Sequence, residues 1–230
     1  MLRATQLIGF VAKKRTPPTI NYVTKSFDTS NATSYSYSSL SIGAESSDRL
    51  VIAVMTNHNG SSTAVRTLSS CTIGGVSATV AGTDGHGAAG GASVGWGVAY
   101  LLVASGTTAT IDFTLSGGVS NCLCSVYTVT GWSSQAPTVY SDTARVIEIA
   151  LGSHPNGAAL GAAVHNTSDQ TYTTSSTGSV QPTIVATDAH GSEAGYSALI
   201  SLTNASGSPT VSITSSSSTT NEAGFVAVWE

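Results

Sequence analysis

The chain has 230 residues, enough for one large domain or two small ones. Charged residues make up only 9% of it, against about 25% in typical soluble proteins, and 37 serines with 32 threonines supply almost a third. This composition is too apolar for a disordered tail, and it lacks the charged, helix-periodic pattern of a bundle or coiled coil. The sequence also contains no run of about 18 apolar residues that could cross a membrane.

Strand signals recur along the whole chain, each bounded by Gly, Asn, Asp or Ser clusters. In chain order they predict strands at 20–27, 34–42, 49–56, 71–81, 96–104, 108–115, 121–130, 144–151, 158–165, 170–174, 180–187, 196–203, 210–214 and 224–229. Gly74-Gly75 between apolar flanks is typical of a two-residue hairpin turn, and the glycine-rich segment 82–97 is interpreted as a flexible surface loop. Short strands at this spacing predict an all-β fold, an antiparallel β-sandwich of jelly-roll type.

The two halves of the chain resemble each other. Matching segments follow in the same order: 83–87 with 187–191, 97–106 with 196–207, 109–114 with 209–214, and 124–129 with 224–229, while 54–59 matches 161–166 more loosely. We therefore predict an internally duplicated unit of about six strands, at about 33–131 and 142–230. The two units could combine into one two-sheet sandwich or form two tandem sandwiches. The short segment 131–143 between them favours the single sandwich.

Basic residues are concentrated at the start of the chain. The first 25 residues contain Arg3, Lys13, Lys14, Arg15 and Lys25, whereas the other 205 contain three basic and all twelve acidic residues, a charge of −9. We predict an extended basic N-terminal arm, residues 1–19, ahead of a β-sandwich body, residues 20–230. The five basic residues are the candidate partner contacts, since such an arm favours an acidic surface on a neighbouring subunit, another protein or nucleic acid. The alternative is a frayed terminus that only aids solubility.

The apolar stretch 7–12 is too short for a secretory signal, and the basic residues follow it instead of preceding it. Synthesis and assembly in the cytoplasm are therefore expected. Cys71, Cys122 and Cys124 lack the fourth ligand of a zinc site and are interpreted as small core residues. A disulfide from Cys71 to one of the others, or to another chain, is the alternative.

An Asp-x-His-Gly motif occurs twice, at Asp84/His86 and Asp188/His190. Each pair could share a metal ion or orient a histidine base, but in loops between strands Asp and Gly are ordinary turn formers. The sequence has no nucleophile elbow and no phosphate-binding loop. We therefore expect no enzymatic activity, no cofactor and no metal.

Among the aromatic residues, Trp96 and Trp229 lie within strand patterns and are interpreted as core. Trp132 follows a strand and is the most free to face outward, which makes it a possible glycan contact. Nucleic acid is not an expected specific partner of the body, because single strands bind in basic grooves and the body is acidic.

Four segments carry a resemblance to a known group of proteins: the opening Met1–Phe10, Ser47–Val54, the hairpin Thr72–Thr79, and Ala104–Ile111. With them the chain resembles the small β-sandwich virion proteins of tailed bacteriophages. The resemblance implies a decoration, cement or tail-associated subunit located in the virion. It transfers no functional residue, because the group has no shared catalytic motif.

We therefore expect a non-enzymatic structural subunit that binds phage capsid or tail proteins through its arm and sheet edges, in several copies and without a membrane. Capsid decoration is favoured over a tail or neck position. The alternative function is a carbohydrate-binding, receptor-recognition module of a tail fibre or adhesin.

Overall fold

The computed structural model describes residues 16–87, 91–143, 146–154, 157–165, 172–177, 195–196, 209–215 and 222–230. Every regular element in these ranges is a β-strand, and all the strand pairings are antiparallel. The predicted all-β, antiparallel sandwich class is therefore confirmed.

The first part of the chain forms two sheets. Sheet A has the order β1 (Thr19–Asp28), β9 (Asn121–Thr130), β3 (Leu50–Asn59), β7 (Ser93–Leu102), β6 (Thr79–Gly87). Sheet B has the order β2 (Ala32–Ser41), β8 (Thr108–Val119), β4 (Leu68–Ile73), β5 (Val76–Ser77).

The second part forms two further sheets from its own strands. Sheet C has the order β10 (Thr138–Asp142), β16 (Glu222–Trp229), β12 (Ala158–His165), β14 (Gly195–Tyr196). Sheet D has the order β11 (Val146–Ala150), β15 (Thr210–Ser215), β13 (Tyr172–Ser176). In the described strands the halves do not mix within a sheet, so the single two-sheet sandwich that the short connection favoured is wrong. The short segment 131–143 is long enough to connect the two halves because the second pair of sheets stacks directly on the first.

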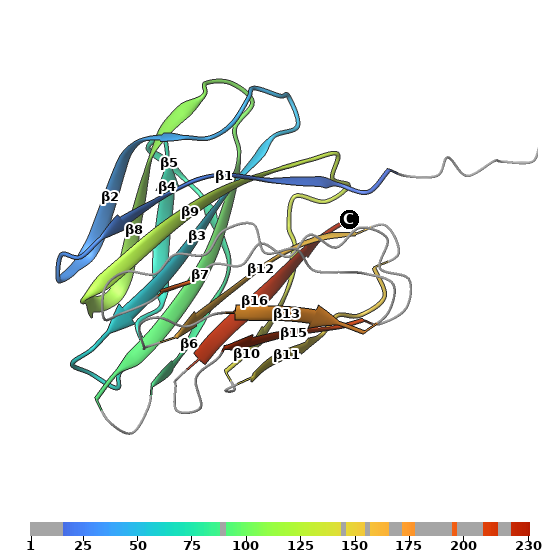
Figure 1. The fold of residues 1–230 in the computed structure, drawn as a ribbon. Coiled ribbons are helices and arrows are strands. Elements are labelled where there is room, and N and C mark those ends of the chain that lie inside the picture. Colours follow the sequence, from blue (N-terminus) through green and yellow to red (C-terminus); the bar gives the residue numbers. More distant parts are fainter. Residues whose placement is uncertain are drawn as a thin grey trace, which may run out of the picture.

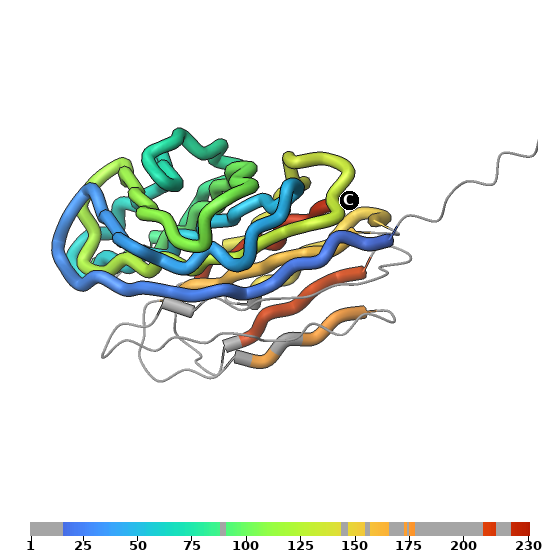
Figure 2. The backbone as a smooth tube through the Cα atoms, turned by 90° about the horizontal axis from the view of Figure 1, so that it is seen from above, coloured from blue at the N-terminus to red at the C-terminus, as the bar shows by residue number. Residues whose placement is uncertain are grey.

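The four sheets stack in the order B, A, C, D, with the first pair at the upper left and the second at the lower right of Figure 1. Alternate residues of β3 show this: Val51, Ala53 and Met55 pack toward sheet B. Leu50, Ile52 and Val54 pack toward sheet C. Since side chains alternate between the faces of a strand, sheet A is covered on both faces at its central strand β3, which is buried at every position. Figure 2 shows the layers from above.

The contact between sheets A and C joins the two halves. Trp96 of β7 stacks on Phe225 of β16, with ring centroids 4.6 Å apart, and both rings are buried. On sheet C, β12 presents mostly alanine (158–163 is AALGAA). Small side chains on β12 let the neighbouring sheets approach it closely. Trp96, and equally Trp229, are core residues as predicted.

The pairing pattern of the second half follows that of the first. The order in sheet A, β1-β9-β3-β7, matches the order in sheet C, β10-β16-β12-β14. The order in sheet B, β2-β8-β4, matches the order in sheet D, β11-β15-β13. The two sets of strands with this matching order span 19–130 and 138–229.

The registers refine one sequence match. Val54 pairs with Ser125, and Ala162 pairs with Phe225, exactly 100 residues after Ser125. Val54 therefore corresponds to Ala162, and both lie in the core between sheets A and C. The sequence match set Val54 against Gly161, one residue out of register. Such a slip places every side chain on the opposite face.

Most predicted strands are present, with ends shifted by a few residues, and 121–130 and 158–165 coincide with β9 and β12. The hairpin at Gly74-Gly75 is also present, with both glycines at positive φ. Strand β10 was not predicted. The predicted strand at 180–187, most of that at 196–203 and the segment 187–191 lie outside the described residues.

The interpretation of 82–97 as a flexible loop is wrong, because most of it belongs to the paired strands β6 and β7. The glycines there allow a close approach. A Cβ on Gly85, Gly95 or Gly97 would lie within 3 Å of Val65, the Arg66 carbonyl or Leu68 respectively. The chain between β3 and β4 therefore crosses these strands at backbone distance, which only glycine permits.

All three cysteines are free and buried, as the core interpretation predicts, and Cys71 forms no disulfide with Cys122 or Cys124. They face the core between sheets A and B. Burial raises the pKa of Cys71 and Cys122 to about 12, and it holds the pKa of Cys124 well above its usual value.

We therefore expect no thiol to react with Ellman's reagent in the native protein and three to react in denaturant, because the thiolate is the reactive form. Val76 is 57% exposed in the hairpin, so Val76→Cys supplies a matched reactive thiol as control. A native wild-type thiol that reacts as fast as this control would contradict the prediction.

Candidate functional site: a groove beside the first strand

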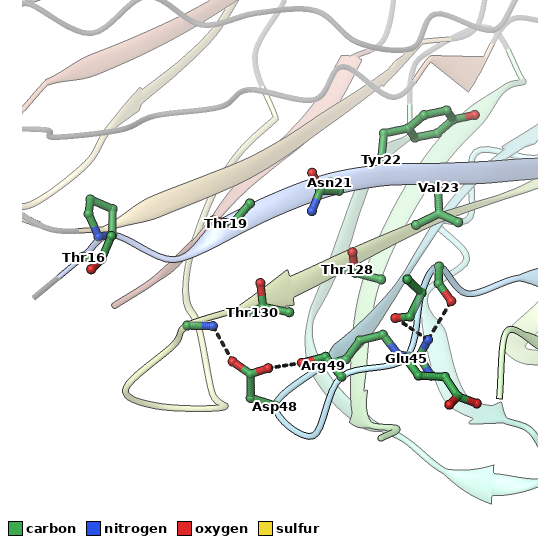
Figure 3. Close-up of a pocket in the computed structure, with 15 residues that line it drawn as sticks. Thr16, Thr19, Asn21, Tyr22, Val23, Glu45, Asp48, Arg49, Thr128 and Thr130 are labelled. Carbon is green, nitrogen blue, oxygen red and sulfur yellow. Dashed lines mark hydrogen bonds between the residues drawn. The ribbon is translucent and has the colours of Figure 1, made fainter. Parts of the chain in front are cut away.

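A groove with a volume of about 760 Å³ lies where sheet A extends beyond sheet B. We call it the β1 groove; it is lined by Thr16, Pro17, Thr19, Asn21, Tyr22, Val23, Gly43, Ala44, Glu45, Ser46, Asp48, Arg49, Thr128, Thr130 and Gly131 (Figure 3). Its volume falls within the range of roughly 300–1,000 Å³ usual for binding sites.

The floor of the groove is a polar part of sheet A. Thr19 pairs with Thr130, and Asn21 pairs with Thr128, on the face that carries Val23 further along. This face is covered by sheet B at Val23 but not at Thr19. Because the uncovered residues bear hydroxyl and amide groups, the floor offers hydrogen-bond donors and acceptors to a bound chain.

The wall of the groove is the loop 43–49, which Arg49 organises. The Arg49 side chain is almost fully buried (1% exposed). Its Nε donates to the Val103 carbonyl, one terminal nitrogen to Gly43 and Ala44, and the other to Ser105 and Gly106, at 2.7–3.2 Å. All five N–H groups of the guanidinium therefore bind carbonyl oxygens, and Arg49 joins two loops instead of presenting its donors to the groove.

Two carboxylates lie in this wall. Asp48 accepts hydrogen bonds from the Ser46 hydroxyl and, at 2.8 Å, from the Gly131 N–H. These bonds hold the pKa of Asp48 below its usual value, so it is ionised at neutral pH. Glu45 is exposed and accepts a bond from the Gly106 N–H at 2.6 Å. Sequence reasoning missed Glu45, Asp48 and Arg49. The sequence signal that could have indicated this loop was Arg49, a single arginine at the start of an apolar strand.

The predicted arm contacts Arg3, Lys13, Lys14 and Arg15 lie outside the described residues. Lys25 lies within β1, paired with Ser125 of β9, so it belongs to the sheet and not to the arm. The first described residues, Thr16 and Pro17, line the β1 groove. The basic tripeptide 13–15 is thus directly connected to the groove.

Trp132 is half-buried and packs against the core between sheets A and C. Its indole N–H donates to the Asp48 carbonyl at 2.6 Å. The ring therefore helps to fix the loop beside the groove, and only part of it is at the surface.

The first Asp-x-His-Gly motif lies on a strand, not in a turn. Asp84 and His86 both belong to β6, and the His86 ring bonds the Thr143 carbonyl at 2.9 Å. Asp188 and His190 lie outside the described residues. Within the described ranges, no three His, Cys, Asp or Glu side chains gather as metal ligands would.

A second polar cluster ties the last strand to the linker between the halves. His154 bonds the Tyr140 hydroxyl at 2.9 Å through Nε2 and the Glu230 carboxylate at 2.7 Å through Nδ1. Ser133 donates its hydroxyl to the main-chain oxygen of Glu230 at 2.6 Å. Both ring nitrogens of His154 are engaged, so the ring is held in place by its neighbours.

His165 is fully buried at the end of β12, opposite Glu222 of β16. Burial, with a smaller contribution from His58, lowers the pKa of His165 to about 4. The imidazole is therefore neutral at physiological pH.

Comparison with protein-family models, curated proteins and solved structures finds no match. In the described ranges, none of the elements is a helix long and apolar enough to span a membrane. What the geometry offers is a polar groove with two carboxylates, next to the point where a basic segment joins the body.

Proposed function

We propose that this chain is a non-enzymatic structural subunit of a bacteriophage virion. It is assembled in the host cytoplasm, in several copies, and binds capsid or tail proteins through its N-terminal arm and sheet edges. Capsid decoration is the favoured role, and a tail or neck position the next. The observation that carries the proposal is the direct continuation of the basic arm into β1, an edge strand of sheet A, whose central strand β3 is buried at every position.

This connection suits an anchor. Strand β1 pairs with β9 along its whole length, from Thr19 with Thr130 to Asp28 with Cys122. A load on the arm is therefore carried by a long ladder of backbone hydrogen bonds, in a sheet that sheets B and C hold from either side. A merely frayed terminus needs no such attachment.

The strand order also supports the proposal. When β1–β5 and β7–β9 are lettered B to I, sheet A reads B-I-D-G with β6 added, and sheet B reads C-H-E-F. We infer from this order that the first half is a jelly roll, an architecture common among viral coat proteins. The described strands of the second half follow the same order, and we infer a duplicated jelly roll. Fold alone does not establish function, so this support is by analogy.

The outer face of sheet B has the surface chemistry that close packing favours. It carries Ser34 opposite Thr114, and Ser36 opposite Asp112. The Asp112 carboxylate accepts bonds from the Ser36 and Thr72 hydroxyls, at 2.6 and 2.7 Å. A surface of short hydroxyl side chains loses little conformational entropy and little ion hydration on contact with another protein.

Incorporation into particles tests the proposal. Particles are assembled in cells that supply tagged full-length chain, the variant lacking residues 1–18, or the triple variant Lys13→Gln/Lys14→Gln/Arg15→Gln. We expect both variants to fall about tenfold or more in copies per purified particle, because the basic contact supplies the attraction. Lys25→Gln applies the same type of substitution to one basic residue of the body, removing one charge instead of three, and should be incorporated normally.

Circular dichroism of the truncated protein checks that the body still folds. Full incorporation of the folded truncated chain would refute the proposal. Gold labelling of the tag then distinguishes capsid from tail or neck.

The glycan-binding alternative depends on Trp132. Its N–H bond to Asp48 and its packing against the core leave less of the ring for sugar stacking than the sequence indicated. Under the structural role, a glycan array detects no binding for Trp132→Ala or for the wild type.

A further inference from the structure

We propose that the β1 groove of one copy binds the basic segment Lys13-Lys14-Arg15 of a second copy, so that copies of the chain associate arm into groove. This inference rests on the proposed role of the N-terminal segment as the binding element, and it names the body of a second copy as one acceptor of that segment.

Charge complementarity is the first argument. The groove wall carries the carboxylates of Glu45 and Asp48, and the proposed occupant carries three adjacent positive charges. Arg49 adds one positive charge to the wall, but it is buried and its N–H groups are bound to five carbonyls. The approaching segment therefore meets the two carboxylates, on a body whose 205 residues after position 25 carry −9.

The shape of the groove is the second argument. It runs along β1 from Thr16 to Val23, and Gly43 closes it at the Val23 end. Its floor is made of extended strands with hydroxyl and amide side chains. An extended peptide of a few residues fits such a floor, because its backbone groups and its lysine stems both find partners along the strand direction.

The direction of the chain indicates that the occupant comes from another copy. Figure 3 places Thr16 at one end of the groove and Glu45 toward the other, with Asp48 between them. Pro17-Pro18 restricts the backbone at residues 16–18 to extended conformations that continue the direction of β1. The chain's own residues 13–15 would have to reverse at once to reach Glu45. For a second copy, an arm of 15 residues spans up to about 50 Å when extended.

Analytical ultracentrifugation of full-length chains tests the inference with charge reversal. The groove variant is Glu45→Lys; the arm variant is Lys13→Glu/Lys14→Glu/Arg15→Glu. We expect the wild type to self-associate, with an affinity that falls as the salt concentration rises. Each variant alone should self-associate with an affinity lower by about tenfold or more. Mixing the two variants should restore association, because the unchanged basic arm of the groove variant then meets the unchanged acidic groove of the arm variant. Only contacts between copies produce this rescue.

Glu148 is an exposed carboxylate on β11, outside the groove, so Glu148→Lys is the matched control and should associate like the wild type. A wild type that stays monomeric, a groove variant that associates normally, or a mixture without rescue would overturn the inference. Particle incorporation is read separately. If any of these contradicting results is found but incorporation still requires the arm, the arm-into-groove inference fails and the proposed function stands. If incorporation does not require the arm, the proposed function fails.

Discussion

Replacing Arg49 by methionine is expected to lower the free energy of unfolding by about 3 kcal/mol or more. Methionine fills much of the space of the buried side chain but leaves five carbonyl oxygens, on two loops between Gly43 and Gly106, without their donors in a part-buried site that water reaches only in part. Each buried acceptor left unsatisfied costs about 1–3 kcal/mol, partly relieved by relaxation of the two loops. Urea denaturation of wild type and variant measures the difference.

Arg49→Lys is the informative control. Lysine keeps the charge but has only three donors on one nitrogen and cannot reach both loops, so we expect an intermediate loss of stability. A loss below about 1 kcal/mol for Arg49→Met would mean that the loops are held together by other contacts.

Replacing Trp96 by alanine is the second large expected effect, a loss of about 3–5 kcal/mol. Trp96 is buried between sheets A and C and stacked on Phe225. Removing the ring leaves a cavity that two rigid sheets cannot close. Denaturation of Trp96→Ala, Phe225→Ala and the double variant gives the coupling between the rings.

We expect the double variant to be less destabilised than the sum of the single variants, because each truncation removes the same contact. Leu102 is 41% exposed at the end of the same strand, and Leu102→Ala should cost far less. Additive effects of the two ring truncations would show that the halves do not depend on this contact.

How far the sequence predicts the fold depends on what each segment packs against. Strands β9 and β12 were predicted with their exact ends because their apolar runs stop at turn residues. Segment 82–97 was not predicted as strands, because a glycine-rich sequence is usually interpreted as a loop. In the fold those glycines admit a neighbouring backbone, which is a tertiary requirement that local patterning does not reveal.

The stacking of the halves was hidden for a similar reason. A strand buried on both faces loses the alternation that would reveal its orientation, so β3 and β12 gave no indication of a second covering sheet. The basic N-terminal arm could be predicted because the distribution of charge is a property of the sequence itself. The groove was not, since it forms only when loop 43–49 lies beside β1.

The double coverage of β3 also sets how this sequence can change over generations. All ten of its residues are buried, so selection should remove nearly every polar replacement of its apolar residues, Leu50–Met55. Sequence similarity to distant homologues should therefore be preserved chiefly in the inner strands β3 and β9. A search for such homologues should match those two segments first.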